Sequence, residues 1–253
     1  MKSRGMKTRR IVVGILLLAM ALGGCGKSEA RDLDGEPITV SEDTSYIDVA
    51  KLREGNSDIF AWLNVPGTNI ACPVLQSSEG DDSFYTNHNF LKNVDVNGAV
   101  YIEAANLQDM CDFNTVVHGS SYTEDAPFDQ LDRYLDKAFF DENEYIYVYL
   151  DGNALAYYIF AAYLRDNERL VEQYDFSYAS GCQDFIDEIF ESRSMSKLVR
   201  EGWEGQVKPE NFLITLTTTN AETGKQLVVV GTLIGDVAGT IDRYVDYGDP
   251  EEY

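Results

Sequence analysis

The sequence predicts a mainly β domain with a few helices, built as a closed barrel or a sandwich. Short runs of alternating or β-branched residues recur along the chain, and turn residues separate them at intervals of roughly 8–12 residues. At 253 residues and 44% hydrophobic content, the chain can bury one substantial core. Its middle contains no linker long enough to divide it, so we expect a single folded domain.

The first 25 residues differ in composition from everything that follows. A basic start precedes an apolar run over 11–22, which is shorter than the ~20 residues of a membrane-spanning helix and has the length of a signal-peptide core. Leu22-Gly23-Gly24-Cys25 follows directly and resembles the lipobox of bacterial lipoproteins. We therefore expect 1–24 to be removed as a signal peptide and Cys25 to carry lipid. The alternative is an uncleaved membrane anchor with an incidental cysteine.

Outside this start, the composition defines a tether, a domain and a tail. Residues 25–45 are polar and lack an apolar period, which is typical of a flexible tether, whereas 46–240 form the predicted domain and 241–253 an acidic tail. Lys and Arg number 20 against 43 Asp and Glu, a net charge of −23. This balance disfavours nucleic acid and anionic lipid headgroups as partners of the domain surface. We expect an acidic extracytoplasmic protein, held at the membrane by its N-terminal lipid.

The domain is predicted to begin with a short helix that ends at Gly55. Two strands follow, at 59–65 and 69–75, because Pro66-Gly67 is a strong turn signal between two strand-like runs. Further strands are predicted at 98–103 and 114–118.

The middle of the chain combines helical and strand patterns. Apolar residues at helical spacing predict a helix over 127–135 with a proline in its first turn, and a second short helix at 138–143. Strict alternation over 145–150 predicts a strand whose three tyrosines share one face. These tyrosines either line a ligand groove or form a half-buried strand face. Asp151-Gly152 predicts a hairpin turn to a partner strand at 154–164.

A long connection separates these strands from the last pair. Phe185, Ile186, Ile189 and Phe190 stand at helical spacing and predict an amphipathic helix over about 181–192. The last two strands are predicted at 212–219 and 226–236.

Several separate stretches of the chain carry a resemblance to one known family. They are 56–70, 73–76, 84–90, 98–102, 128–131 and 215–218. Together they resemble the class B sortases, over about 50–236, and their ordered spacing makes the resemblance much more specific than any single motif. It implies a closed sortase-type β-barrel with an N-terminal helix and a helix in the long connection before the penultimate strand. Family members are exported cysteine transpeptidases, which cleave a sorting signal in a surface protein and join it to a cell-wall amine.

All three catalytic positions of that family are substituted in this chain. The family motif T-L-x-T-C reads Thr215-Leu-Thr-Thr-Thr219 here, so Thr219 takes the place of the nucleophilic cysteine, after Thr217 and Thr218 as binding positions. Ser120 takes the place of the histidine, and Gln226 most simply that of the arginine. A hydroxyl nucleophile needs a base, which Ser120 cannot provide, and Gln226 brings no positive charge to an oxyanion.

These substitutions predict an inactive protein that binds a sorting-signal-like peptide or a peptidoglycan component. The alternative is an active class B sortase-type transpeptidase that uses displaced residues. His118 lies two residues before Ser120, displaced by ~6.6 Å along an extended strand, and Lys225 is the neighbour of Gln226. We favour a structural role for His118. A third hypothesis is a lipoprotein that uses the barrel only as a scaffold.

Neither a metal ion nor another cofactor is expected. The acidic groups Glu79, Asp81 and Asp82, and Glu124 with Asp125, lack the spacing of an EF-hand, and we expect solvated surface there. Cys72, Cys111 and Cys182 form an odd set without C-x-x-C spacing. Buried free thiols are predicted, with one disulfide between two of them as the alternative.

Overall fold

The computed structural model describes residues 47–191, 196–220, 222–239 and 241. The predicted signal peptide 1–24, the tether 25–45 with Cys25, and 242–253 of the predicted tail lie outside the described residues. In the ranges that are described, no helix is both long and apolar enough to cross a membrane.

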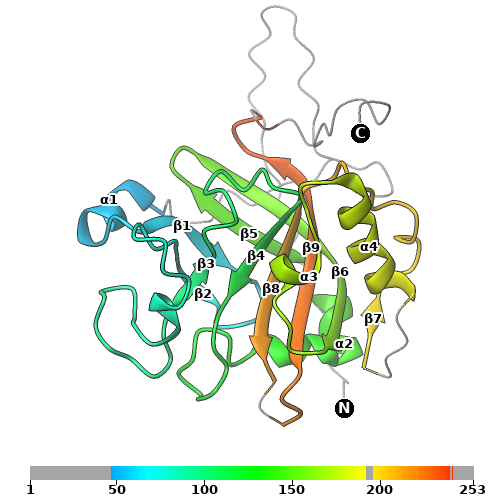
Figure 1. The fold of residues 1–253 in the computed structure, drawn as a ribbon, viewed down its shortest axis with the longest axis horizontal. Helices are drawn as coiled ribbons and strands as arrows, with labels where there is room; N and C mark the ends of the chain where they lie inside the picture. The colour runs from blue at the N-terminus through cyan, green and yellow to red at the C-terminus, as the bar shows by residue number, and fades with distance from the viewer. Residues whose placement is uncertain (1–46, 192–195, 221, 240, 242–253) are drawn as a thin grey trace, which may run out of the picture.

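In the described part of the chain, eight strands close into a barrel (Figure 1). Their order is β5-β1-β2-β3-β4-β8-β9-β6, and β6 pairs back with β5. A two-residue strand, β7 (Leu198–Val199), adds to the far half of β6. The prediction of a mainly β fold closed as a sortase-type barrel is therefore confirmed. The barrel strands are β1 Ile59–Asn64, β2 Ala71–Leu75, β3 Val100–Ile102, β4 Asn114–His118, β5 Tyr145–Leu150, β6 Asn153–Arg165, β8 Leu213–Thr219 and β9 Gln226–Asp236.

The predicted turns join neighbouring strands of the barrel. Gly67 has φ +81° and Gly152 has φ +77°, a left-handed conformation that glycine adopts at little cost. Asp151-Gly152 is a two-residue hairpin loop, since Leu150 of β5 pairs directly with Asn153 of β6. The turn residues thus fix the register of the strands on either side.

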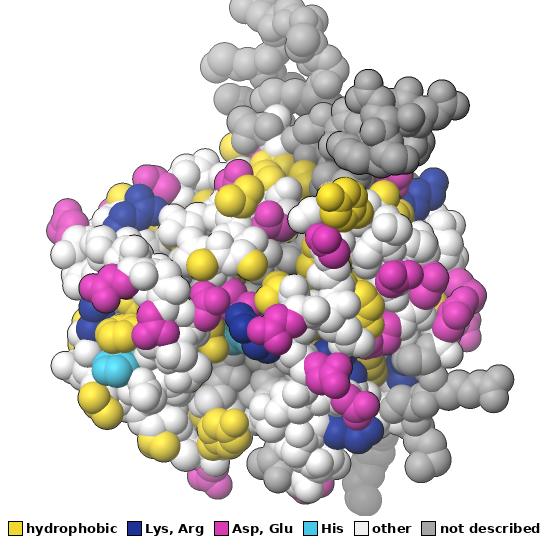
Figure 2. Space-filling view, viewed as in Figure 1, with side chains coloured by type: hydrophobic (Ala, Val, Ile, Leu, Met, Phe, Trp, Pro, Cys, Tyr) yellow, Lys and Arg dark blue, Asp and Glu magenta, His cyan; other side chains and the backbone are white. Residues whose placement is uncertain are grey.

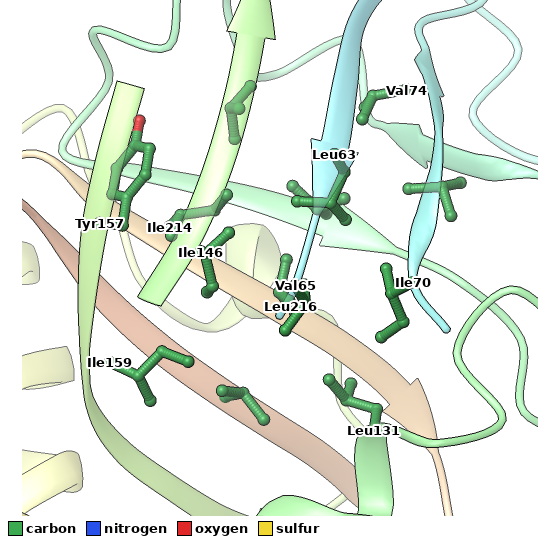
Figure 3. Packing of buried hydrophobic residues seen from close by; sticks show 14 of the residues in the cluster. Leu63, Val65, Ile70, Val74, Leu131, Ile146, Tyr157, Ile159, Ile214 and Leu216 are labelled. Atoms are coloured by element: carbon green, nitrogen blue, oxygen red, sulfur yellow. The ribbon is translucent and has the colours of Figure 1, made fainter. Parts of the chain in front are cut away.

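Alternate residues of the same strands build two separate cores. Leu63, Ile146, Ile214 and Leu216 point into the barrel with their neighbours (Figure 3). The side chains between these inward-pointing residues face outward. On β9, for example, Val228 packs with residues of helix α4 in a second core. The period of two along each strand therefore provides an inner face and an outer face, both buried at this side of the barrel.

Helix α4 (Ala179–Glu191) forms in the long connection, as predicted, and lies against the outer side of β6 and β9 (Figure 1). Its apolar stripe supplies Phe185, Ile186 and Ile189 to the outer core, all nearly inaccessible to solvent. The short helix α3 (Leu170–Gln173) and strand β7 were not predicted from the sequence.

Two other helices match their predictions and one does not. Helix α1 (Val49–Gly55) is capped by Asp48, whose carboxylate accepts from Lys51 N at 2.9 Å, and α2 (Lys137–Glu142) lies where a second short helix was expected. The predicted helix over 127–135 is wrong in type: only the 3-10 helix η2 (Leu131–Leu135) forms there. Its apolar residues are buried as expected, but Leu131 N donates to Phe128 O, a bond of the tighter 3-10 type. A further 3-10 turn, η1, spans Phe84–Thr86.

Candidate functional site

A cavity of about 460 Å³ opens on the outer face of the barrel, at the ends of β4, β8 and β9. It brings together most of the residues that the sequence singled out, because the family positions all stand at or just beyond strand ends. Lys225 is not among the lining residues. The predicted residues that line the cavity are His118, Ser120, Thr217, Thr218, Thr219 and Gln226, and the others include Asp82, Tyr101, Glu103, Glu168 and Arg169.

Strand register explains why these side chains share one face. His118 on β4 stands opposite Thr217 on β8, and Thr219 stands opposite Gln226 on β9. Gln226 in turn stands opposite Arg165 on β6. Directly opposed residues of neighbouring strands project their side chains to the same side of a sheet. These polar side chains therefore share the outer face of the sheet in two rows that adjoin along β8, one with His118 and Thr217 and one with Thr219, Gln226 and Arg165.

Thr219 ends β8 and is fastened through its backbone. Its carbonyl accepts from Ser121 Oγ at 3.0 Å, and the same Ser121 oxygen accepts from Thr218 Oγ1 at 3.0 Å. Within the described residues, the structure records no hydrogen bond to the hydroxyl of Thr219. The loop after β4 thus holds the end of β8, while no base among the described residues is hydrogen-bonded to the hydroxyl of Thr219.

Ser120 serves to join loops. Its hydroxyl donates to Asn97 O at 2.8 Å, and its carbonyl accepts from Phe128 N at 2.9 Å. The preceding Gly119 allows this close packing, because a Cβ there would lie 2.7 Å from the buried Phe128 ring. Both polar groups of Ser120 are therefore engaged with backbone rather than with Thr219.

Gln226, and not Lys225, stands opposite Thr219. The Gln226 side chain is nearly buried, and its Oε1 accepts from Arg165 Nη1 at 2.6 Å. Lys225 precedes β9, and its Nζ lies 3.7 Å from Asp166 Oδ1 at the protein surface. The register therefore places Gln226, rather than Lys225, beside Thr219.

His118 contacts a carboxylate and an aromatic ring. Its Nε2 lies 3.4 Å from Glu103 Oε1, and its ring stacks on Tyr101 with a centroid distance of 5.1 Å. Burial lowers the pKa of His118 below its ordinary value, although the Glu103 carboxylate opposes this effect. The structure records no contact between His118 and Thr219 in the described residues. A structural role for His118 stays a prediction.

An ion pair between the buried Glu103 and the half-exposed Arg169 lies beside His118 and was not predicted. Glu103 is almost inaccessible, and its Oε2 lies 3.0 Å from Arg169 Nη2 while its Oε1 accepts from Arg169 Nε at 3.1 Å. Hydrogen bonding to Glu103 raises the pKa of Arg169, and burial, with the charge of Glu103, raises the pKa of Tyr101 to about 12. Glu103 and Arg169 are 66 positions apart, so no local pattern could have paired them.

Asp82 is the acidic residue for which the expectation of plain solvated surface is wrong. Its Oδ1 accepts from Ala104 N at 2.7 Å, and its Oδ2 lies 3.4 Å from Arg169 Nη2. The backbone of 104 and the side chain of Arg169 come from distant parts of the chain, so the barrel turns this loop carboxylate into part of the cavity wall.

The cavity wall carries more negative than positive charge. Three carboxylates line it, from Asp82, Glu103 and Glu168, against the one guanidinium of Arg169 among the described lining residues. Asp and Glu side chains are also spread over the surrounding face of the molecule (Figure 2). A neutral or cationic ligand therefore fits this cavity better than an anion does.

The cysteines lie away from this chemistry. Cys72, Cys111 and Cys182 form no disulfide among the described residues, so the prediction of thiols without a disulfide is confirmed, although only Cys182 is fully buried. Burial raises the pKa of Cys72 to about 12 and that of Cys111 to about 11. Since the thiolate is the nucleophilic form, both thiols are poor nucleophiles near neutral pH.

Comparison with known proteins shows a similarity to sortase B. The chain is 26% identical over 186 residues to sortase B of Staphylococcus aureus, and the alignment covers 72% of this chain and 73% of the relative. No family model matches the chain.

Solved structures agree with this similarity. Clostridium perfringens sortase B superimposes with a TM-score of 0.65 and 28% identity, over 74% of this chain and 99% of that one. The Staphylococcus aureus sortase B–substrate complex superimposes with a TM-score of 0.61 and 25% identity, over 74% of this chain and 84% of that one. A sortase B complexed with triglycine gives 0.61 and 25%, over 73% and 84%.

Proposed function

We propose that this chain, a protein of the class B sortase fold, is a binding module without transpeptidase activity that holds a peptide or a cell-wall component in its outer cavity. The observation that carries the proposal is the set of partners around Thr219. Among the described residues, its hydroxyl makes no recorded hydrogen bond to an imidazole or a cation, while Ser120 and Gln226 are engaged with Asn97 and Arg165. Loss of a catalytic set leaves little beyond binding.

The geometry of the cavity supports the binding half of the proposal. Strand ends that hold an extended peptide keep their shape when the reacting groups change. A sortase B has been solved with triglycine and the Staphylococcus aureus protein with its substrate, which indicates the kind of ligand to test. The excess of carboxylates in the wall favours a peptide that is neutral or positively charged near the cavity.

The decisive experiment combines binding with turnover. Residues 26–253 would be incubated with the substrate of Staphylococcus aureus sortase B and with triglycine as the amine acceptor. We expect binding of the substrate, detected by calorimetry, and no cleavage product by mass spectrometry. Cleavage that Thr219→Ala or His118→Ala abolishes would contradict the proposal.

That last outcome would instead support an active transpeptidase with displaced residues. One observation keeps this second candidate testable: His118 lines the same cavity as Thr219. Against it, His118 contacts Glu103, and Lys225 lies beside Asp166 rather than in the cavity. Folded protein that binds no peptide would favour a scaffold role.

A gain-of-function variant tests whether the binding groove is intact. Thr219→Cys, Ser120→His and Gln226→Arg, introduced together, place the family residues at the matching positions. Cleavage of the substrate by this variant would support an intact binding groove, because the new groups act only on a correctly placed peptide. A folded triple variant that neither binds nor cleaves the substrate would count against the groove.

The proposal includes a location outside the cytoplasmic membrane, with lipid on Cys25. The basic start, the short apolar run and Leu22-Gly23-Gly24-Cys25 support it. Wild-type protein should fractionate with membranes and resist extraction by salt. Cys25→Ala should leave the protein with an uncleaved N-terminus, a change that mass spectrometry detects. An unmodified Cys25 in the mature wild-type protein would overturn the lipid anchor.

A further inference from the structure

We propose that the amide nitrogen of Gln226 donates a hydrogen bond to a peptide carbonyl oxygen of the ligand, and that Arg165 is the positioning residue that orients this amide. The inference rests on the proposed binding function and names the contact through which the cavity holds its ligand. Its starting point is the buried hydrogen bond of 2.6 Å between Arg165 Nη1 and Gln226 Oε1.

The chemistry of this bond fixes the orientation of the amide. A guanidinium has donors and no acceptor, so the atom that faces it must be the carbonyl oxygen of Gln226 and not the nitrogen. The Nε2 group of Gln226, with its two donors, is thereby turned away from Arg165. Gln226 lines the cavity directly opposite Thr219, and the described residues provide no recorded partner for Nε2. The two N–H groups of Gln226 Nε2 are therefore available to a ligand in the cavity.

Arg165 itself is held rigidly. Its Nε and Nη2 donate to Glu188 of α4 at 2.8 and 3.2 Å, its Nη1 donates to Glu168 O at 2.9 Å, and its Nη2 donates to Gln173. Together with Gln226, these acceptors occupy all five N–H groups of the guanidinium. Its charge is balanced by Glu188, so Arg165 acts on the cavity through Gln226 and not by direct contact with an anion.

The electrostatics of the wall select the class of acceptor. A carboxylate of the ligand would be repelled by Asp82, Glu103 and Glu168, which outnumber Arg169. A peptide carbonyl is a strong acceptor without net charge, and a buried neutral donor that gains such a partner adds measurable affinity. Thr217, one row away on the same face of the sheet, is a second sign of a polar ligand group, because its Oγ1 is buried without a hydrogen bond among the described residues.

The test measures affinity in matched variants of the full chain, purified in detergent. The probe is the fluorescein-labelled substrate of Staphylococcus aureus sortase B, followed by fluorescence anisotropy. Gln226→Glu keeps an acceptor for Arg165 but replaces the donor with an acceptor, and Gln226→Met removes the donor without adding charge. We expect Kd to rise about tenfold or more in both. Glu222→Gln, an exposed change in the same turn, should leave Kd within about twofold.

Arg165 is tested through its dependence on Gln226. Arg165→Lys keeps the charge and loses the planar fork, so the amide of Gln226 is free to turn. We expect Arg165→Lys to weaken binding in the wild-type background and to have no further effect in the Gln226→Met background. Equal weakening in both backgrounds would show a merely structural role for Arg165 and would overturn its part in the proposal.

The outcomes separate this inference from the proposed function. Wild-type protein that does not bind the probe would overturn both. Binding by wild type that persists unchanged in folded Gln226→Glu and Gln226→Met would overturn the donor role alone and leave the binding module intact. Thermal unfolding of each variant identifies any that has lost the fold, and an affinity change in Gln226→Glu with an unchanged melting temperature supports the donor role.

Discussion

At the scale of single residues, burial changes the pKa values of groups that line the cavity. His118 is the clearest case, since its pKa is lowered by burial against the opposing charge of Glu103. In the unfolded chain a histidine titrates near ~6.5. Between that value and its lower folded pKa, the unfolded state binds a proton that the folded state does not, so folding loses stability as pH falls through this range.

We therefore expect the free energy of unfolding to fall as pH is lowered from about 7 to about 5, by at most ~1.4 kcal/mol per pH unit from this group. His118→Gln should flatten that part of the profile, measured by urea unfolding at each pH. His88→Gln is the matched control and should retain the slope. An unchanged slope in His118→Gln would contradict the assignment.

Two threonines on one face of β8 differ in a single hydrogen bond. Thr217 Oγ1 is buried without a hydrogen-bond partner in the part of the chain that the structure describes, whereas Thr215 Oγ1 donates to Asn114 Oδ1 at 2.8 Å. Replacing a hydroxyl by a methyl of the same shape removes an unsatisfied polar group in the first case and a buried hydrogen bond in the second. We expect Thr217→Val to raise the free energy of unfolding by about 1 kcal/mol.

Thr215→Val should lower it by about the same amount, measured by urea unfolding of the two variants in parallel. A loss of stability in Thr217→Val would mean that its hydroxyl has a partner in solution, such as an ordered water.

At the scale of elements, the carboxylate of Glu188 ties α4 to the barrel within a largely apolar interface. Glu188 accepts from Arg165 Nε at 2.8 Å and from Tyr163 at 2.9 Å. Burial opposes its ionisation, but the hydrogen bonds from Arg165, Tyr174 and Tyr163 outweigh that effect and lower the pKa of Glu188. The helix that covers the outer core therefore also holds the guanidinium that orients Gln226.

Glu188→Gln should destabilise the protein by about 3 kcal/mol, because it leaves the nearly buried charge of Arg165 without its counter-ion. The free energy of unfolding in urea measures the effect. Asp187→Asn, a neighbouring exposed position on α4, should change it by less than about 0.5 kcal/mol. Equal effects at the two positions would contradict the buried pair.

At the scale of the whole molecule, net charge sets the response to salt. With 43 acidic against 20 basic side chains, repulsion between like charges opposes the compact state. Raising NaCl from about 0.02 to about 0.5 M shortens the screening length from roughly 20 to roughly 4 Å. We expect the urea midpoint to rise over this range, and KCl at the same ionic strength to act alike. A fall would show that specific ion pairs dominate.

The sequence alone determined most of the barrel, because each strand and hairpin has a local signal. The alternation over 145–150, the turn at Asp151-Gly152 and the helical stripe of α4 are properties of neighbouring residues. The resemblance to the class B sortases singled out Thr219, Ser120 and Gln226 in the sequence, and all three line one cavity. The helix predicted over 127–135 failed because packing against the barrel selected the tighter 3-10 turns.

Only the tertiary structure decided what surrounds those positions. The pairs Glu103 with Arg169 and Arg165 with Gln226 join residues that are 66 and 61 positions apart, brought into contact by barrel closure and by the register of β6 with β9. The alternation of side chains along one strand follows from the sequence. Which residue of a neighbouring strand stands opposite a given side chain does not, because that pairing depends on the strand order and register that the closed sheet adopts as a whole.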